Sequence, residues 1–314
     1  MIHRKTTLIL GAGASAPFGF PTGYELLRRV IAWADVNPGQ TNPNLFSEFD
    51  RTQINEFREA LEKSGKISVD SFLERRPEFI RIGKRAMAMA LIQCEHQPHL
   101  FKRDGKSWYE YLFNQLDTQF DDFNQNQLSV LTFNYDRSLE HFLFTALKNA
   151  SGKSENECAK KLESIPIIHL HGDLGALPYT INSPMRPYNS EITQVALNIA
   201  TSRMKIIHEG IANEPQFAQA HNILSESEII CFLGFGYHRL NMERLGFKAT
   251  KNGQRIDYPK ASEKIIGSTY GLTHAESDQI DSHYGLNLKY AFDRNRYCAP
   301  FEVFQYLRET GVLH

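Results

Sequence analysis

One repeated pattern constrains the fold more than any other: a short apolar run, then small or polar residues, then helical spacing. The first run, Thr6–Leu10, is rich in β-branched residues and stops abruptly at glycine. Such runs are typical of strands buried on both faces of a parallel sheet. Four further runs share the pattern: Leu128–Phe133, Ile165–Leu170, Ile229–Leu233 and one beginning at Lys264–Ile266. The recurrence predicts an α/β fold with a doubly wound, mainly parallel, Rossmann-like sheet.

A long helical stretch separates the first strand–helix unit from the second strand. The apolar residues of Thr22–Ala34 have helical spacing, and Asn37–Asn44 has the composition of a loop. The pattern from Leu45 to Phe123 is again mostly helical. We interpret residues 40–125 as a helical module inserted within a single domain that spans residues 1–314. Its clustered apolar residues are assigned to the core: Phe72, Leu73, Phe79 and Ile80.

Downstream of the second strand, the pattern predicts a helix over Ser138–Leu147 and a long loop over Gly175–Ser190. It predicts a further helix over Glu191–Leu224. In sheets of this kind ligands bind beyond the carboxyl ends of the strands. The residues that follow each strand are therefore the candidates for a functional site.

Composition narrows the classes of partner and compartment. The 35 basic and 36 acidic residues give a net charge of −1, so we expect no general attraction to nucleic acids or to an anionic membrane. The four cysteines, Cys94, Cys158, Cys231 and Cys298, form no CxxC pair, and we expect no metal. We expect a cytoplasmic protein, because the thiols are scattered and the sequence has no signal peptide and no membrane-spanning run. The balanced charge favours a small-molecule or protein partner.

The glycine turn after the first strand matches a phosphate-binding pattern. Gly11-x-Gly13-x-x-Ala16 stands between a strand and a helix, as the dinucleotide-binding motif G-x-G-x-x-G/A requires. The loop Pro17–Gly23 follows, and it could cover a bound dinucleotide. A dehydrogenase would also need a carboxylate about 20 residues further on, to hold the ribose. That position falls within the helix Thr22–Ala34, so hydride transfer is disfavoured.

Polar residues follow the next strands, and each has a structural alternative. Asn134 and Asp136 come after the second strand, where either could cap the following helix. His171 comes after the third strand, while His169 is interpreted as a structural residue. Gly267–Thr269 after the fifth run could contact an adenosine or form a plain turn.

Four of these segments resemble motifs of the sirtuin (SIR2) superfamily, in the same order. They are Gly11–Ser15 with Gly19-x-Pro21-x-Gly23, then Thr132–Asp136, His169–Gly172 and Gly234–Tyr237. Deacetylases of that family carry a four-cysteine zinc module, which this sequence lacks. The chain more closely resembles the SIR2-like proteins of bacterial antiphage defence, in which helices replace that module. His238 and Asn241 depart from the serine-and-aspartate pattern common in relatives.

The resemblance implies that NAD is the substrate, that no metal is needed, and that NAD hydrolysis depletes the infected cell. Asn134, His171 and Asp136 would be catalytic. Nicotinamide leaves NAD as a neutral molecule, so the enzyme must mainly stabilise an oxocarbenium-like ribose and position water. His171 could bind a ribose hydroxyl or act as a base, Asn134 could fix the attacking water or the nicotinamide ribose, and Asp136 could stabilise positive charge or hold the nicotinamide amide. The expected binding residues are Gly11, Ala12, Gly13, Ser15, Ala16, Pro21, Thr22, Thr132, Gly234, Gly236, Tyr237 and Ser268.

Two other functions remain open. One is a zinc-free NAD-dependent deacylase or ADP-ribosyltransferase, and the other is a non-catalytic NAD or ADP-ribose sensor module. A free NADase would kill its host, so we also expect control by a separate regulatory or sensor protein, by assembly into a homo-oligomer, or by both.

Overall fold

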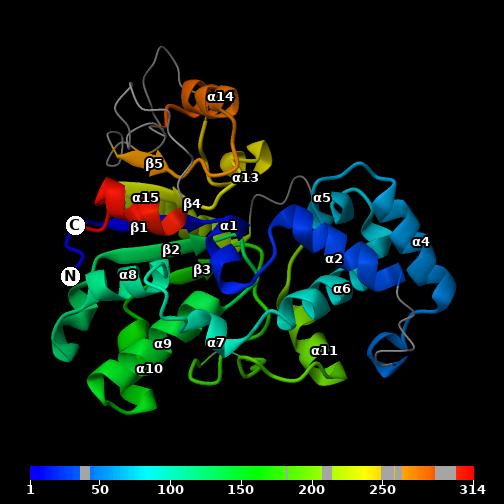
Figure 1. Ribbon diagram of the computed structural model, residues 1–314, viewed down its shortest axis with the longest axis horizontal. Coiled ribbons are helices and arrows are strands. Elements are labelled where there is room, and N and C mark those ends of the chain that lie inside the picture. Colours follow the sequence, from blue (N-terminus) through cyan, green and yellow to red (C-terminus); the bar gives the residue numbers. More distant parts are fainter. Residues whose placement is uncertain (36–42, 182, 207–213, 249–257, 259–263, 287–301) are drawn as a thin grey trace.

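A five-stranded parallel sheet forms the centre of the computed structural model, which describes residues 1–35, 43–181, 183–206, 214–248, 258, 264–286 and 302–314 (Figure 1). Its strands lie in the order β3-β2-β1-β4-β5. Their bounds are β1 Thr6–Leu10, β2 Leu128–Thr132, β3 Ile167–His169, β4 Ile229–Leu233 and β5 Ile265–Gly267. All four pairings are parallel. The prediction of a parallel α/β sheet is therefore confirmed, and the arrangement is consistent with a Rossmann-like fold.

The central strand β1 is buried on both faces, as its continuous apolar run predicts. It pairs with β2 on one side and with β4 on the other, from Thr6 to Leu10 in both cases. Successive side chains of a strand point to opposite faces. Leu8 and Leu10 accordingly belong to one hydrophobic cluster and Ile9 to another. Helices must therefore cover both faces of the sheet.

Separate sets of helices provide these two covers. The cluster around Leu8 and Leu10 includes residues of α8 (Trp108–Leu116), α9 (Ser138–Ser151), α10 (Glu155–Leu162) and α15 (Val303–Thr310). The cluster around Ile9 includes residues of α12 (Pro215–Glu226), α13 (Arg239–Arg244) and α14 (His274–Tyr284). None of the described helices is long and apolar enough to cross a membrane.

Four of the helices that precede β2 lie beyond the carboxyl ends of the strands. Figure 1 shows them with α11 (Gln194–Arg203) beyond the end of β1 that carries the short helix α1 (Ala12–Ser15). They are α2 (Gly23–Asp35), α4 (Arg51–Glu62), α5 (Val69–Leu73) and α6 (Ile80–Ile92), and the short helix α7 (Gln97–Leu100) follows them in the chain. Short 3-10 turns occupy Ala16–Phe18, Pro43–Phe46, Pro77–Phe79 and Phe120–Gln125. That this segment is an insertion into a single domain stays a prediction.

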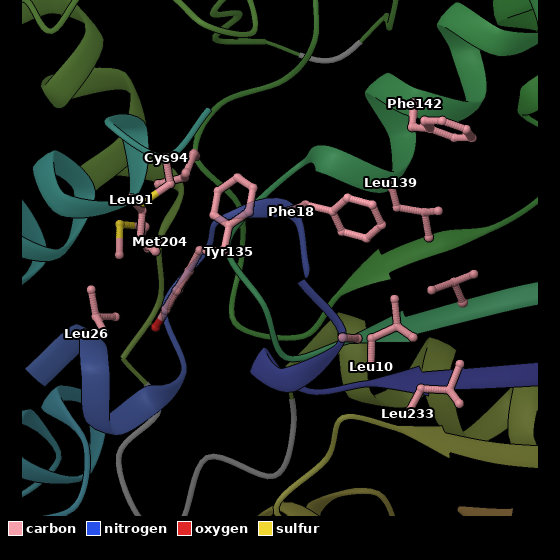
Figure 2. Packing of buried hydrophobic residues seen from close by; sticks show 14 of the residues in the cluster. Leu10, Phe18, Leu26, Leu91, Cys94, Tyr135, Leu139, Phe142, Met204 and Leu233 are labelled. Carbon is pink, nitrogen blue, oxygen red and sulfur yellow. The ribbon is translucent and has the colours of Figure 1, made fainter. Parts of the chain in front are cut away.

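The helical segment and the sheet share one core. Figure 2 shows Leu26 and Leu91 from the helical segment, Leu10 and Leu233 from the sheet, and Tyr135 between them. The cluster assigned to the core from sequence also joins it. Phe72 and Leu73 are buried, whereas Phe79 and Ile80 are partly buried against it, so that assignment is confirmed.

A buried charge cluster ties the helical segment to the rest of the chain. Glu95, which lies between α6 and α7, accepts hydrogen bonds from Arg137 and Arg186 at 2.6–3.0 Å. All three residues are at most 2% exposed. Arg137 also donates to the carbonyl oxygens of Gly175 and Arg186, at 2.7 and 2.6 Å. The segment before α7, the start of α9 and the loop after β3 are thereby held together.

Several elements differ from their predicted bounds: β2 ends at Thr132 rather than Phe133, and α9 continues to Ser151 beyond the predicted Leu147. The third strand is shorter than Ile165–Leu170, and the helix expected over Glu191–Leu224 is wrong as a single helix. In the structure α11 ends at Arg203, Met204 is extended, and α12 begins at Pro215. Residues 37–42 of the predicted loop, residues 207–213 of that helix, and Cys298 lie outside the described residues.

Candidate functional site

A cavity of about 200 Å³ lies at the carboxyl ends of the strands. Strand order reverses between β1 and β4, and in open α/β sheets this switch point is where ligands bind. Residues after four strands line it: Gly11 and Ala12 after β1, Phe133 and Asn134 after β2, His171 after β3, and Phe235 and Gly236 after β4. The other wall comes from Ser68, Asp70, Ser71 and Glu74 around α5, and from His238, Asn241 and Arg244 around α13.

The glycine turn after β1 packs tightly against the end of β4. A Cβ on Gly11 would lie 2.5 Å from the carbonyl oxygen of Gly234, and one on Gly234 would lie 2.1 Å from the backbone nitrogen of Ala14. The Gly13 N–H donates to the Gly234 carbonyl at 3.0 Å, and the Ala14 N–H donates to Gly11 at 2.9 Å. Close backbone packing thus explains these glycines without a ligand. Of the turn, Gly11 and Ala12 line the cavity.

This packing predicts a specific effect of mutation. Gly234 has a φ of 55°, so Gly234→Ala meets both a left-handed backbone and a backbone clash. We expect a loss of roughly 2–3 kcal/mol in the free energy of unfolding. Gly236→Ala is the matched control, because a Cβ there meets nothing within 4 Å. Urea unfolding of both variants measures the difference, and equal stabilities would contradict the account.

The Asn134 side chain is held in one orientation. Its amide nitrogen donates to the Gly11 carbonyl at 2.9 Å and to the Ser15 hydroxyl at 3.0 Å. Because a backbone carbonyl only accepts hydrogen bonds, this contact identifies the nitrogen and leaves Oδ1 as the remaining acceptor. The Asn134 N–H donates to Thr132 Oγ1 at 3.0 Å, which fixes the backbone as well. Asn134 is therefore a preorganised acceptor at the cavity.

His171 is a buried, neutral histidine at the cavity. It is 7% exposed, and its Nε2 has no hydrogen-bond partner among the described residues. Burial, with the positive charge of Arg244, lowers the pKa of His171 to about 3. A buried ring nitrogen without a partner costs about 1–3 kcal/mol, so a hydrogen bond from a ligand in the cavity would be favourable there. The imidazole can exchange hydrogen bonds near neutral pH but is a weak base there.

His169 has the structural role interpreted from the sequence. Its Nδ1 lies 2.8 Å from the backbone oxygen of Asn134 and its Nε2 lies 2.5 Å from Glu140 Oε1. Both partners are acceptors, so both ring nitrogens carry protons. Burial opposes the charge, but Glu140 outweighs it and raises the pKa of His169 to about 9. The resulting imidazolium fixes the backbone of Asn134.

The charge on His169 makes stability depend on pH. Its pKa is about 9 in the folded protein and near 6.5 when unfolded. The folded state therefore binds the proton more tightly, and this contribution is complete below pH 6.5 and disappears as pH rises through 9. We expect the free energy of unfolding to fall by roughly 2–3 kcal/mol as the pH rises through this range. Urea unfolding between pH 6 and 10 measures it, and His169→Gln should flatten the curve. A wild-type curve as flat as that of the variant would refute the assignment.

Asp136 lies outside the cavity lining and serves the start of α9. It is 8% exposed, and its Oδ1 accepts hydrogen bonds from the backbone N–H and the hydroxyl of Ser138. Burial raises the pKa of Asp136, against hydrogen bonds from Ser138 and Ser15. The N-cap residue of α9 is Arg137, so Asp136 does not cap the helix but binds its first residue, Ser138, from one position further back; a catalytic role for Asp136 stays a prediction. Ser15, which also contacts Asn134, links the two side chains.

The other expected binding residues support the site or lie apart from it. Ser268 is 2% exposed and its hydroxyl accepts from the Gly234 N–H at 2.9 Å. Tyr237 donates to the Ser268 carbonyl at 3.1 Å. The Thr22 hydroxyl donates to Glu25 at the start of α2. The cavity lining does not include these residues or Gly13, Ser15, Ala16, Pro21, Thr132 and Gly234, whereas it does include Gly236.

Sequence reasoning missed α5 as a wall of the cavity, and around α13 it had noted only His238 and Asn241. Asp70 accepts a hydrogen bond from the Tyr135 hydroxyl at 2.5 Å, and burial raises the pKa of its carboxyl. Glu74 forms an ion pair with Arg244 at 3.1 Å, so its charge is balanced across the cavity. No spacing in the sequence relates α5 to the strand ends, because tertiary packing alone brings them together.

Comparisons with known proteins do not identify a function for the site. No family model matches the chain, and a search of curated proteins finds no match either. Within the described residues, no three His, Cys, Asp or Glu side chains are grouped so as to hold a metal ion.

Proposed function

We propose that the chain is an NAD+ glycohydrolase, which cleaves the nicotinamide–ribose bond to give nicotinamide and ADP-ribose. The observation that carries the proposal is that Asn134 and His171 line one cavity at the switch point of the sheet. Among the described residues His171 Nε2 has no hydrogen-bond partner, the amide nitrogen of Asn134 is held so that its Oδ1 is the remaining acceptor, and both residues stand in segments that resemble SIR2 motifs. An amide and a neutral imidazole suit a reaction that depends on positioning the reactants more than on general acid–base catalysis.

The proposed reaction requires one bond to break and one to form. The C–N bond between ribose and nicotinamide breaks, and its electron pair neutralises the positively charged ring nitrogen. The oxygen of a water molecule bonds to the ribose carbon, and the water releases one proton to the solvent. No general acid is required, because the leaving group is already neutral when it departs. The protein must orient the water and stabilise the oxocarbenium-like ribose.

Asn134 and His171 would divide this work. The fixed amide of Asn134 leaves Oδ1 to accept a hydrogen bond from the attacking water or from a ribose hydroxyl. The neutral imidazole of His171 would bind a ribose hydroxyl. With a pKa near 3 it is unsuited to remove a proton in the ground state at neutral pH. Of the two roles open at the outset, we favour hydroxyl binding.

The size of the cavity suggests which part of NAD it takes. About 200 Å³ is less than the roughly 300–1,000 Å³ of sites that enclose a drug-sized molecule. We propose that the nicotinamide–ribose end enters the cavity and that the pyrophosphate leaves along Gly11 and Ala12. The N–H groups of Gly13 and Ala14 are occupied, so this turn offers fewer donors than a standard dinucleotide cradle.

The direct test is incubation of the purified chain with NAD, with nicotinamide and ADP-ribose measured by chromatography. The proposal predicts equal amounts of both products. Release that occurs only with an acylated peptide or a protein acceptor would instead indicate a deacylase or ADP-ribosyltransferase. Tight binding without release, with the chain alone and after assembly, would indicate a sensor module.

We also propose that the activity serves NAD depletion in antiphage defence, under the control of a regulatory protein or of self-assembly. This part rests on the resemblance and on the toxicity expected of a free NADase, as does the interpretation of residues 40–125 as an inserted module. Expression in a bacterial host, with cellular NAD measured before and after phage infection, tests it. NAD that falls only after infection supports control, and a harmless, constitutively active monomer refutes it.

A further inference from the structure

We propose that Asp70 selects the oxidised, positively charged nicotinamide ring, and that α5 is therefore part of the substrate site. The inference deepens the proposed function and rests on it. Asp70 lies on α5 in the helical segment, and the sequence motifs of the strand ends give no indication of it.

Charge balance within the cavity singles out Asp70. The lining contains two carboxyl groups, Asp70 and Glu74, and the second is paired with Arg244 at 3.1 Å. Asp70 forms no ion pair among the described residues: its carboxyl accepts hydrogen bonds from Tyr135 and from its own backbone N–H, and Arg244, which is paired with Glu74, attracts it only weakly. Asp70 is partly buried, and burial without a close cationic partner makes its carboxyl costly to ionise. A cation that enters this cavity would supply the missing charge.

The oxidised and reduced cofactors differ in that charge. The ring of NAD+ is a pyridinium cation, whereas the dihydropyridine ring of NADH is neutral. Opposite charges a few ångströms apart attract strongly where water is excluded. Asp70 should therefore strengthen the binding of NAD+ and contribute little to the binding of NADH. The same negative charge would stabilise the oxocarbenium-like ribose as the bond breaks.

Tyr135 connects this wall to the strand-end residues. Its hydroxyl donates to Asp70, and it directly follows Asn134 in the chain. Tyr135 is 6% exposed and packs between the helical segment and the sheet (Figure 2). The position of Asp70 relative to Asn134 is thus fixed by one rigid side chain.

Ligand charge and proton release are linked at Asp70. Burial raises the pKa of the free carboxyl, and a bound cation would lower it again. Binding of the cationic ligand should therefore release a proton and strengthen as pH rises, while NADH should show neither effect. The charged and titratable groups around Asp70 are Tyr135, Glu74, Arg244, His171 and His238. His238 is exposed, so His238→Asn can remove this imidazole from the cavity and leave Asp70 as the group whose proton is followed.

The test is calorimetric titration with carba-NAD, a cleavage-resistant analogue that keeps the pyridinium charge, and with NADH. Asp70→Asn should weaken carba-NAD binding by roughly 10- to 100-fold and change NADH binding by less than about 2-fold. Glu78→Gln is the control: it removes an exposed carboxylate next to Arg76, outside the cavity lining. An equal loss for both ligands, or no loss, would overturn the proposal.

The wild-type protein provides a second test if Asp70→Asn does not fold. The ratio of carba-NAD to NADH affinity should rise with pH, with proton release visible in buffers of different ionisation enthalpy. The His238→Asn variant should keep this dependence. A ratio independent of pH would overturn the role of Asp70 while leaving NAD hydrolysis intact. A wild-type protein that binds neither ligand would refute the proposed function, and the role of Asp70 with it.

Discussion

Glu95→Ala is expected to destabilise the protein by about 3–5 kcal/mol, enough to unfold much of the population of an average domain. The substitution leaves Arg137 and Arg186 buried, at 2% exposure each, without the carboxylate that both contact. Two like charges would then face each other in a region with little water. Three separate segments would also lose their common anchor.

The matched control is Glu228→Ala, which removes an ion pair with Arg4 at 3.3 Å whose side chains are 41% and 44% exposed. Exposed pairs of this kind contribute about 0–1 kcal/mol. Urea unfolding followed by circular dichroism compares the two variants. Similar midpoints would show that the buried cluster does not hold the helical segment to the sheet.

His171→Ala is expected to lower the rate of NAD cleavage by about 10²–10³-fold with little change in the fold. The substitution removes a ring nitrogen that has no partner in the described protein, so it breaks no internal hydrogen bond of that nitrogen. The loss should appear mainly in kcat if the imidazole binds the ribose more tightly in the transition state than in the ground state.

His141→Ala is an unusually close control. His141 is a partly buried histidine whose two ring nitrogens are buried without partners in the described residues, and burial lowers its pKa to about 4. It lies on α9, outside the cavity lining, and its ring stacks on that of Tyr188 with the ring centroids 4.3 Å apart. It should keep near wild-type activity in the nicotinamide assay. Equal losses in both variants would mean that His171 acts through packing.

The sequence predicts the sheet well where strands are buried on both sides. The runs Thr6–Leu10 and Ile229–Leu233 match β1 and β4, because both pair with two neighbours and need apolar residues throughout. The edge strand β3 covers Ile167–His169, and hydrogen bonds to β2 continue at Pro166 and Leu170, so the predicted run Ile165–Leu170 exceeds the hydrogen-bonded part only at Ile165. The apolar pattern therefore locates this strand well, and the difference lies in where the strand is taken to begin and end.

The helix predicted over Glu191–Leu224 fails for a local reason. Pro215 stands at the first position of α12, where its fixed φ and missing N–H are tolerated. Apolar periodicity continues on both sides of the break and hides it. Proline as a helix-start signal would have separated α11 from α12.

The sequence predicts the part of the candidate site that follows the strands, but not the part that comes from α5 and α13. Asn134 and His171 follow strands directly, and parallel strands bring their carboxyl ends to one edge. Asp70 and Arg244 reach the same cavity through packing of α5 and α13, which no local pattern encodes. The sequence motif predicts the glycines as part of a dinucleotide-binding turn. The structure adds a second reason for Gly11 and Gly234, because backbone packing leaves no room for a side chain at either position.

A crystal structure with carba-NAD tests the central claim most directly. The account predicts the nicotinamide ring in the cavity near Asp70, with its ribose within hydrogen-bond distance of Asn134 and His171. The pyrophosphate should pass Gly11 and Ala12. A ligand bound elsewhere, or one that places its adenine in this cavity and its nicotinamide in solvent, would contradict the account.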